Sequence, residues 1–251
     1  METAWQRLRA AELNERAAAG ALVLLPVAST EQHGPHMATG TDCWLVGEVC
    51  DRAAAKLTGL GQPVVVAPVV WAGLAQHHMA FGGSFTLSLA TYQALLLDLG
   101  QSIKRAGFRR LVIVNGHGGN ITALNAMSAE LTRELGITVG ITTYFHLAEA
   151  AIAPILEDQP GVLHAGEAET SMMLAIQPEL VDKFRLSEAQ GPMAARAGAA
   201  LSGAMHYWRS FKDITASGVM GDARRATADK GERLLEAAAT TLANALAQDK
   251  S

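Results

Sequence analysis

An unbroken apolar run, Ala21–Val27, constrains the fold of this chain more than any other feature of its sequence. A second run, Arg110–Val114, is apolar after its first residue, and neither run alternates polar with apolar side chains. Strands without such alternation are buried on both faces, as in parallel sheets that helices cover on both sides. We therefore expect both runs to be buried strands of a mostly parallel sheet.

The rest of the chain alternates between segments of strand and helix character. Strands are expected over 21–27, 63–70, 110–114 and 137–144, and helices over 3–19, 43–57, 90–106, 121–135 and 227–247. This order predicts an α/β fold whose mostly parallel central sheet is covered on both faces. The 251 residues, 49% of them hydrophobic, are enough for one sizeable core, so we expect a single domain over 1–251.

Polar side chains that suit a metal ion follow the first apolar run. The segment Glu31–His36 (EQHGPH) comes just after the run, and Asp42 lies a little further on. Open α/β sheets place their chemistry beyond the carboxyl ends of strands, and two residues two positions apart in an extended stretch point the same way, as Glu31 and His33 would. Carboxylates and an imidazole together favour zinc, manganese or iron. An ordinary polar surface loop is the alternative that this segment alone leaves open.

A second loop of this kind follows the second apolar run. It spans Asn115–Asn120 (NGHGGN), and its glycines permit a tight turn and a close approach to a ligand. His117 is thereby free to point into the crevice above the sheet, while Asn120 is placed to cap the next helix. A Gly-rich phosphate loop is the alternative, but neither the G-x-G-x-x-G spacing nor a Lys-Ser/Thr pair is present.

A third candidate segment, His164–Ser171 (HAGEAETS), precedes an apolar helical stretch. Glu167 and Glu169 would face about 200° apart on a helix, so they cannot both serve one site. Acids at a helix start also interact favourably with the helix dipole, and we expect only that role for Glu167. Glu169 adjoins the inward-facing run and is the better candidate for a site residue.

Taken together and in this order, these motifs resemble the creatininase family, which comprises creatinine amidohydrolase and its relatives. The resemblance extends from about residue 20 to about residue 240, because the tail from Gly218 to Glu232 also resembles the family's C-terminal pattern. The pieces that carry it are Glu31–His36 with Asp42, Asn115–Asn120, His164–Gly166 with Glu169–Ser171, Gly218–Asp222, Ala226-Thr227 and Lys230–Glu232.

The resemblance implies a three-layer α/β/α sandwich with two divalent metal ions per chain (zinc, manganese or iron) in the crevice of the sheet. Carried over onto this sequence, Glu31 and His117 would hold one metal ion and His33 the other, and Asp42 would bridge the two. Glu169 is the candidate that completes the shell of the second ion.

The resemblance also implies an activity, the hydrolysis of a small cyclic or linear amide C–N bond other than a peptide bond, by a water molecule that two metal ions activate. His164 would transfer protons near the substrate, Glu169 would be catalytic as well as a ligand, and His78 and Gly118 would contact the substrate. A deformylase or a precursor-peptide peptidase of the same family is the near alternative. A non-catalytic metal-binding or ligand-binding protein on this fold is the alternative from another class.

Two departures from the family pattern concern the substrate. Creatininase has a Glu two residues beyond the His of its Asn-Gly-His motif, where this chain has Gly119. Many relatives have a His and then the sequence Phe-Pro-Gly-Thr. Here His78 and Phe81 fit this pattern, but Gly82 replaces the Pro and Ser84 replaces the Thr. Losing the Pro removes a fixed φ angle, and we expect a substrate-contacting lid here, with a mobile surface loop as the alternative. Both departures argue against creatinine as the substrate.

Charge and composition exclude other functions. The net charge of −4 and the lack of a basic stripe argue against nucleic acid, and no apolar run approaches the roughly 20 residues of a membrane span. Cys43 and Cys50 would lie too far apart on one helix for a disulfide. Because the N-terminus also lacks signal-peptide character, we expect a cytoplasmic protein, and the resemblance implies a homo-oligomer, a hexamer. The Ala/Gly-rich stretch Gly191–Gly203 is expected to be a mobile arm or a contact between subunits.

Overall fold

A four-stranded parallel sheet forms the centre of the computed structural model, which describes residues 1–157, 159–193 and 207–249. The strands follow the order β2-β1-β3-β4, and every neighbouring pair is parallel. Their bounds are β1 (Leu22–Val27), β2 (Val64–Val66), β3 (Arg110–Asn115) and β4 (Thr138–Thr143). The predicted parallel sheet is therefore confirmed, and the two apolar runs form its two inner strands.

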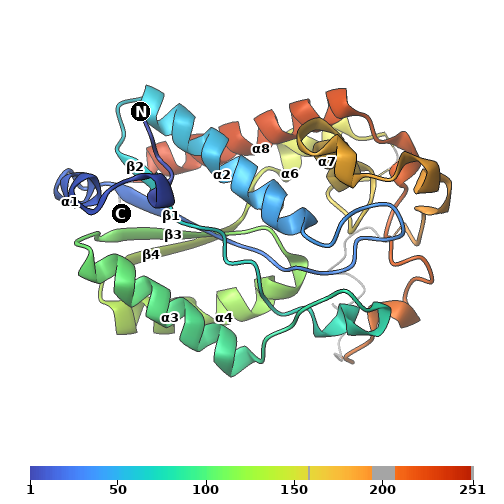
Figure 1. The fold of residues 1–251 in the computed structure, drawn as a ribbon, viewed down its shortest axis with the longest axis horizontal. Coiled ribbons are helices and arrows are strands. Elements are labelled where there is room, and N and C mark those ends of the chain that lie inside the picture. Colours follow the sequence, from blue (N-terminus) through green and yellow to red (C-terminus); the bar gives the residue numbers. More distant parts are fainter. Residues whose placement is uncertain (158, 194–206, 250–251) are drawn as a thin grey trace.

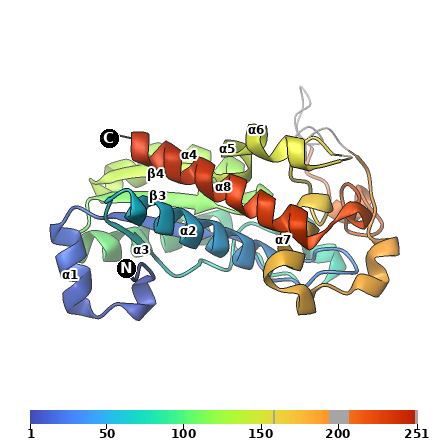
Figure 2. The same cartoon turned by 90° about the horizontal axis from the view of Figure 1, so that it is seen from above.

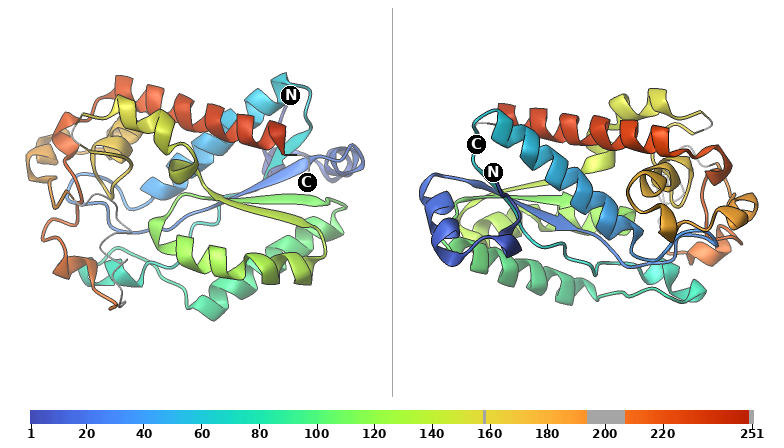
Figure 3. Two further views of the ribbon diagram at one scale, coloured as in Figure 1. Left: turned by 180° about the vertical axis from the view of Figure 1, so that it is seen from behind. Right: turned by 45° about the horizontal axis from the view of Figure 1, so that its top comes forward.

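Helices cover both faces of the sheet, which gives three layers (Figures 1 and 2). One layer contains α2 (Thr41–Gly59), α7 (Glu167–Ile176) and α8 (Ala228–Gln248), with the short helices α5 (Tyr144–Leu147) and α6 (Glu149–Ile152) beside α8. The other layer contains α3 (Leu89–Arg105) and α4 (Ile121–Leu135), and α1 (Ala10–Ala18) lies at the end where β1 begins (Figure 3). The expected α/β/α sandwich is thus confirmed.

Alternate residues of β1 contribute to two separate apolar cores. Leu22 and Leu24 pack with the layer of α2, α7 and α8, whereas Val23 and Leu25 pack with the layer of α3 and α4. All six residues of the strand are buried. The absence of polar alternation in this run follows directly from having a core on each side.

Two elements differ from the expectations. The strand expected over 63–70 ends at Val66, because Pro68 follows and a proline has no N–H for a sheet ladder. The helix expected over 3–19 is divided into a 3₁₀ turn (Trp5–Arg7) and α1. Arg9 has an extended backbone there, and its N–H donates to the carboxylate of Glu12, which starts a new helix.

Three other expectations have different outcomes. Cys43 and Cys50 are free thiols, as predicted. Within the described ranges no helix is long and apolar enough to cross a bilayer. The stretch Gly191–Gly203, expected to be an arm or a subunit contact, falls from residue 194 onward outside the described residues.

Candidate metal centre

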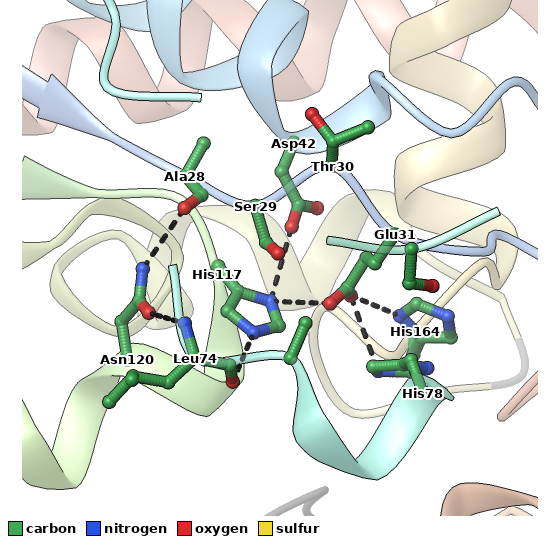
Figure 4. Close-up of polar contacts among 12 residues, drawn as sticks. Ala28, Ser29, Thr30, Glu31, Asp42, Leu74, His78, His117, Asn120 and His164 are labelled. Atoms are coloured by element: carbon green, nitrogen blue, oxygen red, sulfur yellow. Dashed lines mark hydrogen bonds and ion pairs between the residues drawn. The ribbon is translucent and has the colours of Figure 1, made fainter. Parts of the chain in front are cut away.

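Acids and imidazoles from four places in the chain meet at the carboxyl end of the sheet. Figure 4 shows three of them, Glu31, Asp42 and His117. The five residues that form the cluster are each at least 94% buried. The segment after β1 supplies Glu31 and His33, the first turn of α2 supplies Asp42, the loop after β3 supplies His117, and the first turn of α7 supplies Glu169. The structure therefore brings together the three motifs that the sequence singled out.

The loop after β1 turns sharply so that both of its site residues face inward. Gly34 lies at the turn with a φ of +65°, and a Cβ atom there would lie 2.5 Å from a methyl group of Val219. The turn lets His33 pair with Met37, and the backbone N–H of Glu31 donates to the Thr39 carbonyl at 2.9 Å. A glycine is needed at this turn for both its φ angle and its lack of a side chain.

His117 faces two carboxylates with one ring nitrogen. Its Nδ1 lies 3.2 Å from Oε2 of Glu31 and 3.2 Å from Oδ2 of Asp42. Its Nε2 lies 3.2 Å from the carbonyl oxygen of Leu74, which can only accept a hydrogen bond. The ring proton is therefore on Nε2, and Nδ1 has its lone pair toward the carboxylates. An imidazole whose outer N–H is held by a carbonyl is typical of metal ligands.

His33 repeats this arrangement on the other side of Asp42. Its Nε2 lies 3.1 Å from Oδ1 of Asp42 and 3.7 Å from Oε2 of Glu169. Its Nδ1 donates to the backbone carbonyl of Glu31 at 3.0 Å, so Nε2 carries the lone pair. The two oxygens of Asp42 thus face two different imidazoles.

A strained turn positions the last of these acids. Ala165 has a φ of +55°, which is uncommon for a residue with a Cβ atom. Its backbone N–H donates to Oε2 of Glu169 at 2.6 Å. Strain of this kind costs on the order of 1–3 kcal/mol and tends to occur at functional sites. The left-handed turn aims the backbone N–H at the carboxylate and so fixes where Glu169 points.

The burial of three carboxylates dominates the electrostatics of the cluster. Burial raises the pKa of Glu31, and it raises the pKa of Glu169 to about 7. Burial lowers the pKa of His33, but the neighbouring carboxylates outweigh it and raise that pKa to about 10. The pKa of His117 is raised for the same reason. The carboxylates therefore favour positive charge among them, whether it is a proton or a cation.

Two further imidazoles approach the other oxygen of Glu31. His78 Nε2 lies 3.3 Å and His164 Nδ1 lies 3.4 Å from Glu31 Oε1. Their ring centroids are 4.5 Å apart, and the ring of Phe211 packs against both at 4.5 and 5.0 Å. His78, predicted to contact the substrate, lies in the short 3₁₀ helix Gln76–Phe81 and is itself buried.

The two glycines after His117 differ in their surroundings. Gly118, the other predicted substrate contact, is exposed and has open space where a Cβ atom would point. A Cβ atom at Gly119 would lie 2.4 Å from His117 Nε2 and 2.4 Å from the Leu74 carbonyl oxygen. Position 119 therefore has no room for a side chain unless the backbone moves.

Phe211 was not found from the sequence. It lies far along the chain from the motifs and only packs against their imidazoles in the folded protein. No local pattern distinguishes it from any other core aromatic residue, so only the three-dimensional structure identifies it.

Asn120 does not cap α4 with its side chain, contrary to the expectation. The side-chain oxygen of Asn120 accepts a hydrogen bond from the backbone N–H of Leu74 at 2.9 Å, and its amide group contacts the carbonyl of Ala28 and the side chain of Asn115. Its side chain links the loops after β1 and β3 with the segment before His77. The N-cap pattern was present in the sequence, but these long-range hydrogen bonds satisfy the side chain instead.

Glu167 has a larger role than the expected helix-dipole interaction. It is fully buried, and its carboxylate pairs with Lys230 Nζ at 2.7 Å. It also accepts hydrogen bonds from the backbone N–H of Glu157. The pair ties the start of α7, which carries Glu169, to the start of α8.

The fold and the buried cluster together define an α/β protein with a metal-type site beyond the carboxyl ends of parallel strands. A comparison with known proteins gives its family. The family model described as Creatininase: Creatinine amidohydrolase matches residues 6–246. The chain belongs to the creatininase family.

Several relatives have names that indicate different substrates. The chain is 33% identical over 217 residues to the mycofactocin precursor peptide peptidase of Mycobacterium ulcerans, which covers 84% of this chain and 79% of that protein. It is 30% identical over 266 aligned residues to the creatinine amidohydrolase of Pseudomonas putida, covering 95% and 94% of the two chains. A crystal structure of creatininase superposes with a TM-score of 0.83 at 28% identity and covers 98% of this chain and 97% of that one.

We predict that the Glu167–Lys230 pair stabilises the fold without taking part in the chemistry. Lys230→Met leaves a buried carboxylate unpaired and should lower the free energy of unfolding by about 3–5 kcal/mol. Removing both charges, in Lys230→Met with Glu167→Leu, should recover much of that loss. Lys56→Met, which breaks a half-exposed pair with Glu236, is the control and should cost at most about 1 kcal/mol. Urea unfolding of the parent protein and these three variants measures this, and equal losses in both single Lys variants would contradict it.

Proposed function

We propose that this chain is a hydrolase of C–N bonds that works with two divalent metal ions, one on each side of Asp42. The observation that carries the proposal is that each oxygen of this one carboxylate faces a different imidazole, His33 Nε2 at 3.1 Å and His117 Nδ1 at 3.2 Å. Glu31 would complete the ligands of the ion beside His117. Glu169 would complete the ligands of the ion beside His33.

The residues present fit divalent ions. Glu31 Oε2 and Asp42 Oδ2 are buried without a hydrogen-bond partner among the described residues, and both face the lone pair of His117 Nδ1. Carboxylate oxygens and neutral imidazole nitrogens are the ligands that zinc and manganese accept. A related structure of 28% identity and TM-score 0.79 is described as creatininase with manganese, which supports the same assignment here.

Two divalent ions held at such a centre would lower the pKa of a water molecule toward about 7 and polarise a substrate carbonyl. The chain itself has to position the substrate, limit water and move protons. Phe211 covers the imidazoles of His78 and His164 on one side, which limits water at their rings.

His164 is suited to proton transfer through one specific atom. Its Nε2 lies 2.8 Å from the carbonyl oxygen of Gln32, so the ring proton is there and Nδ1 carries the lone pair toward Glu31. Burial lowers the pKa of His164 well below its usual value, so the ring is neutral at neutral pH. A neutral Nδ1 can take a proton from the attacking water and then give it to the leaving nitrogen.

The substrate class is a small amide or a short peptide other than creatinine. Creatininase has a carboxylate ligand at the place of Gly119, and this chain has no room there for a side chain. The difference in ligands argues against the same substrate. The peptidase relatives, at 30–33% identity, support a short peptide as the second candidate. We predict little or no turnover of creatinine in a panel that also holds lactams, formamides and short peptides. Rapid creatinine hydrolysis would contradict the substrate proposal.

We predict that metal content follows the ligand sets. Asp42→Ala should lose both ions because it removes the carboxylate between them, whereas His33→Ala should lose mainly one. Cys43→Ala is the matched control, because its thiol lies next to Asp42 in sequence but contacts the backbone carbonyls of Ser29 and Trp71. Elemental analysis after loading with manganese or zinc gives the stoichiometry. Retention of both ions by Asp42→Ala, or no binding by the parent protein, would contradict the assignment.

We predict that His164 acts on turnover and leaves metal binding intact. His164→Ala should lower kcat by about 10²–10⁴, the range for a general acid–base group, with the metal content of the parent protein. His146→Ala, which changes an exposed imidazole on α5, should leave kcat unchanged. A His164 variant that loses one metal ion per chain would make His164 a ligand instead. Stoichiometric metal binding with no turnover of any amide would instead favour the non-catalytic alternative.

A further inference from the structure

Gln32 lies at the centre of the cluster although it is neither an acid nor an imidazole. Its side-chain oxygen Oε1 accepts a hydrogen bond from the backbone N–H of Gly34 at 2.9 Å. Because that backbone group can only donate, the oxygen of the amide must face Gly34. The NH₂ group of Gln32 therefore faces the other way, toward His78 Nδ1 at 2.9 Å, His164 Nε2 at 3.0 Å and the carbonyl oxygen of Gly218 at 3.1 Å. Because His164 Nε2 itself donates to the backbone carbonyl of Gln32 at 2.8 Å, the two N–H groups of the amide are left for His78 and Gly218.

This orientation fixes the proton of His78. An NH₂ group can only donate, so Nδ1 of His78 must accept and carry a lone pair. In the neutral ring the proton is then on Nε2, which lies 3.3 Å from Glu31 Oε1. His78 therefore presents an N–H group to the carboxylate of Glu31.

The other three imidazoles around these acids have the opposite arrangement. In His33, His117 and His164 the outer nitrogen donates to a backbone carbonyl, so in the neutral ring the inner nitrogen is the one without a proton. The side chains of Glu31, His77 and His78 are also close enough to share an ion, with ligand atoms within 4.8 Å of one another. Because its inner nitrogen carries a proton, His78 is not a metal ligand there.

We propose that Gln32 is a positioning residue that holds His78 in the tautomer whose Nε2–H donates to Glu31 Oε1. With that oxygen occupied by the hydrogen bond, Glu31 Oε2 is left to face His117 and Asp42. The inference rests on the proposed function in so far as Glu31 is a metal ligand. Outer partners that orient ligands in this way typically contribute about 10–100-fold to metal affinity or activity.

The surroundings of Gln32 leave its amide little freedom. A Cβ atom at Gly218, where φ is +79°, would lie 2.2 Å from Gln32 Oε1. Ser84 Oγ accepts a hydrogen bond from the backbone N–H of Gln32 at 3.0 Å. The side chain of Gln32 is thus held by Gly34 in the segment after β1 and by Gly218 in the segment before α8. Phe211 packs on the ring of its partner His78.

Two substitutions at position 32 separate the proton arrangement from simple packing. Gln32→Glu places an acceptor where the NH₂ group was, so Nδ1 of His78 should become protonated. Gln32→Met keeps the bulk but removes the donor, so both tautomers of His78 should be populated. Ser84→Ala is the matched control, because it removes a hydrogen bond to the backbone of Gln32 and leaves the amide in place.

The protons are located by ¹⁵N resonances of the histidine rings, recorded on the metal-free and the zinc-loaded protein and assigned with His78→Gln. The parent protein and Ser84→Ala should show a protonated Nε2 and an unprotonated Nδ1 for His78, and Gln32→Glu should show a protonated Nδ1. In both position-32 variants, kcat or zinc affinity should fall by about 10–100-fold. A protonated Nδ1 in the parent protein, or an unprotonated Nδ1 in Gln32→Glu, would overturn the inference.

The tautomer is observed without any substrate, so this result is independent of turnover. If His78 has the expected tautomer but the parent protein neither binds zinc nor hydrolyses an amide, the role of Gln32 in orienting His78 stands and the proposed function fails. If zinc binds and an amide is hydrolysed while Nδ1 of His78 is protonated in the parent protein, the proposed function stands and the role proposed for Gln32 is wrong.

Discussion

The burial of three carboxylates in one place is the constraint on which the rest of this structure depends. Glu31, Asp42 and Glu169 lie in contact with imidazoles and out of solvent, where uncompensated negative charge costs several kcal/mol per group. Positive charge among them removes that cost, and the raised pKa values of His33 and His117 express the same demand in terms of protons. Backbone carbonyls behind the two rings accept the outer N–H groups, so the inner nitrogen of each ring is the one that can bind a metal ion or a proton.

The fold brings these side chains together from loops and helix ends that are distant in sequence. Parallel strands end at one edge of the sheet, so the loops after β1 and β3 reach the same place without long connections. The starts of α2 and α7 supply the remaining acids. The backbone turns sharply at Gly34 and at Ala165, and both residues have a positive φ angle. The buried pair of Glu167 and Lys230 holds α7 against α8.

The sheet, its layers and the positions of the three motifs could be predicted from the sequence, because each depends on local patterns such as an apolar run followed by polar ligands. What could not be predicted are contacts between segments far apart in the chain. The pairing of Glu167 with Lys230, the long-range bonds of Asn120 and the packing of Phe211 on the imidazoles are of this kind. Gln32 was within a recognised motif, but its role depends on His78 and Gly218, which come from two other loops.

The central claim, that Asp42 lies between two metal ions, is tested most directly by anomalous X-ray scattering from crystals of the protein loaded with manganese. Two anomalous peaks about 3.5–4 Å apart are expected. One would lie among Glu31, Asp42 and His117, and the other among His33, Asp42 and Glu169. A single peak, or a peak among Glu31, His77 and His78 with none beside Asp42, would contradict it.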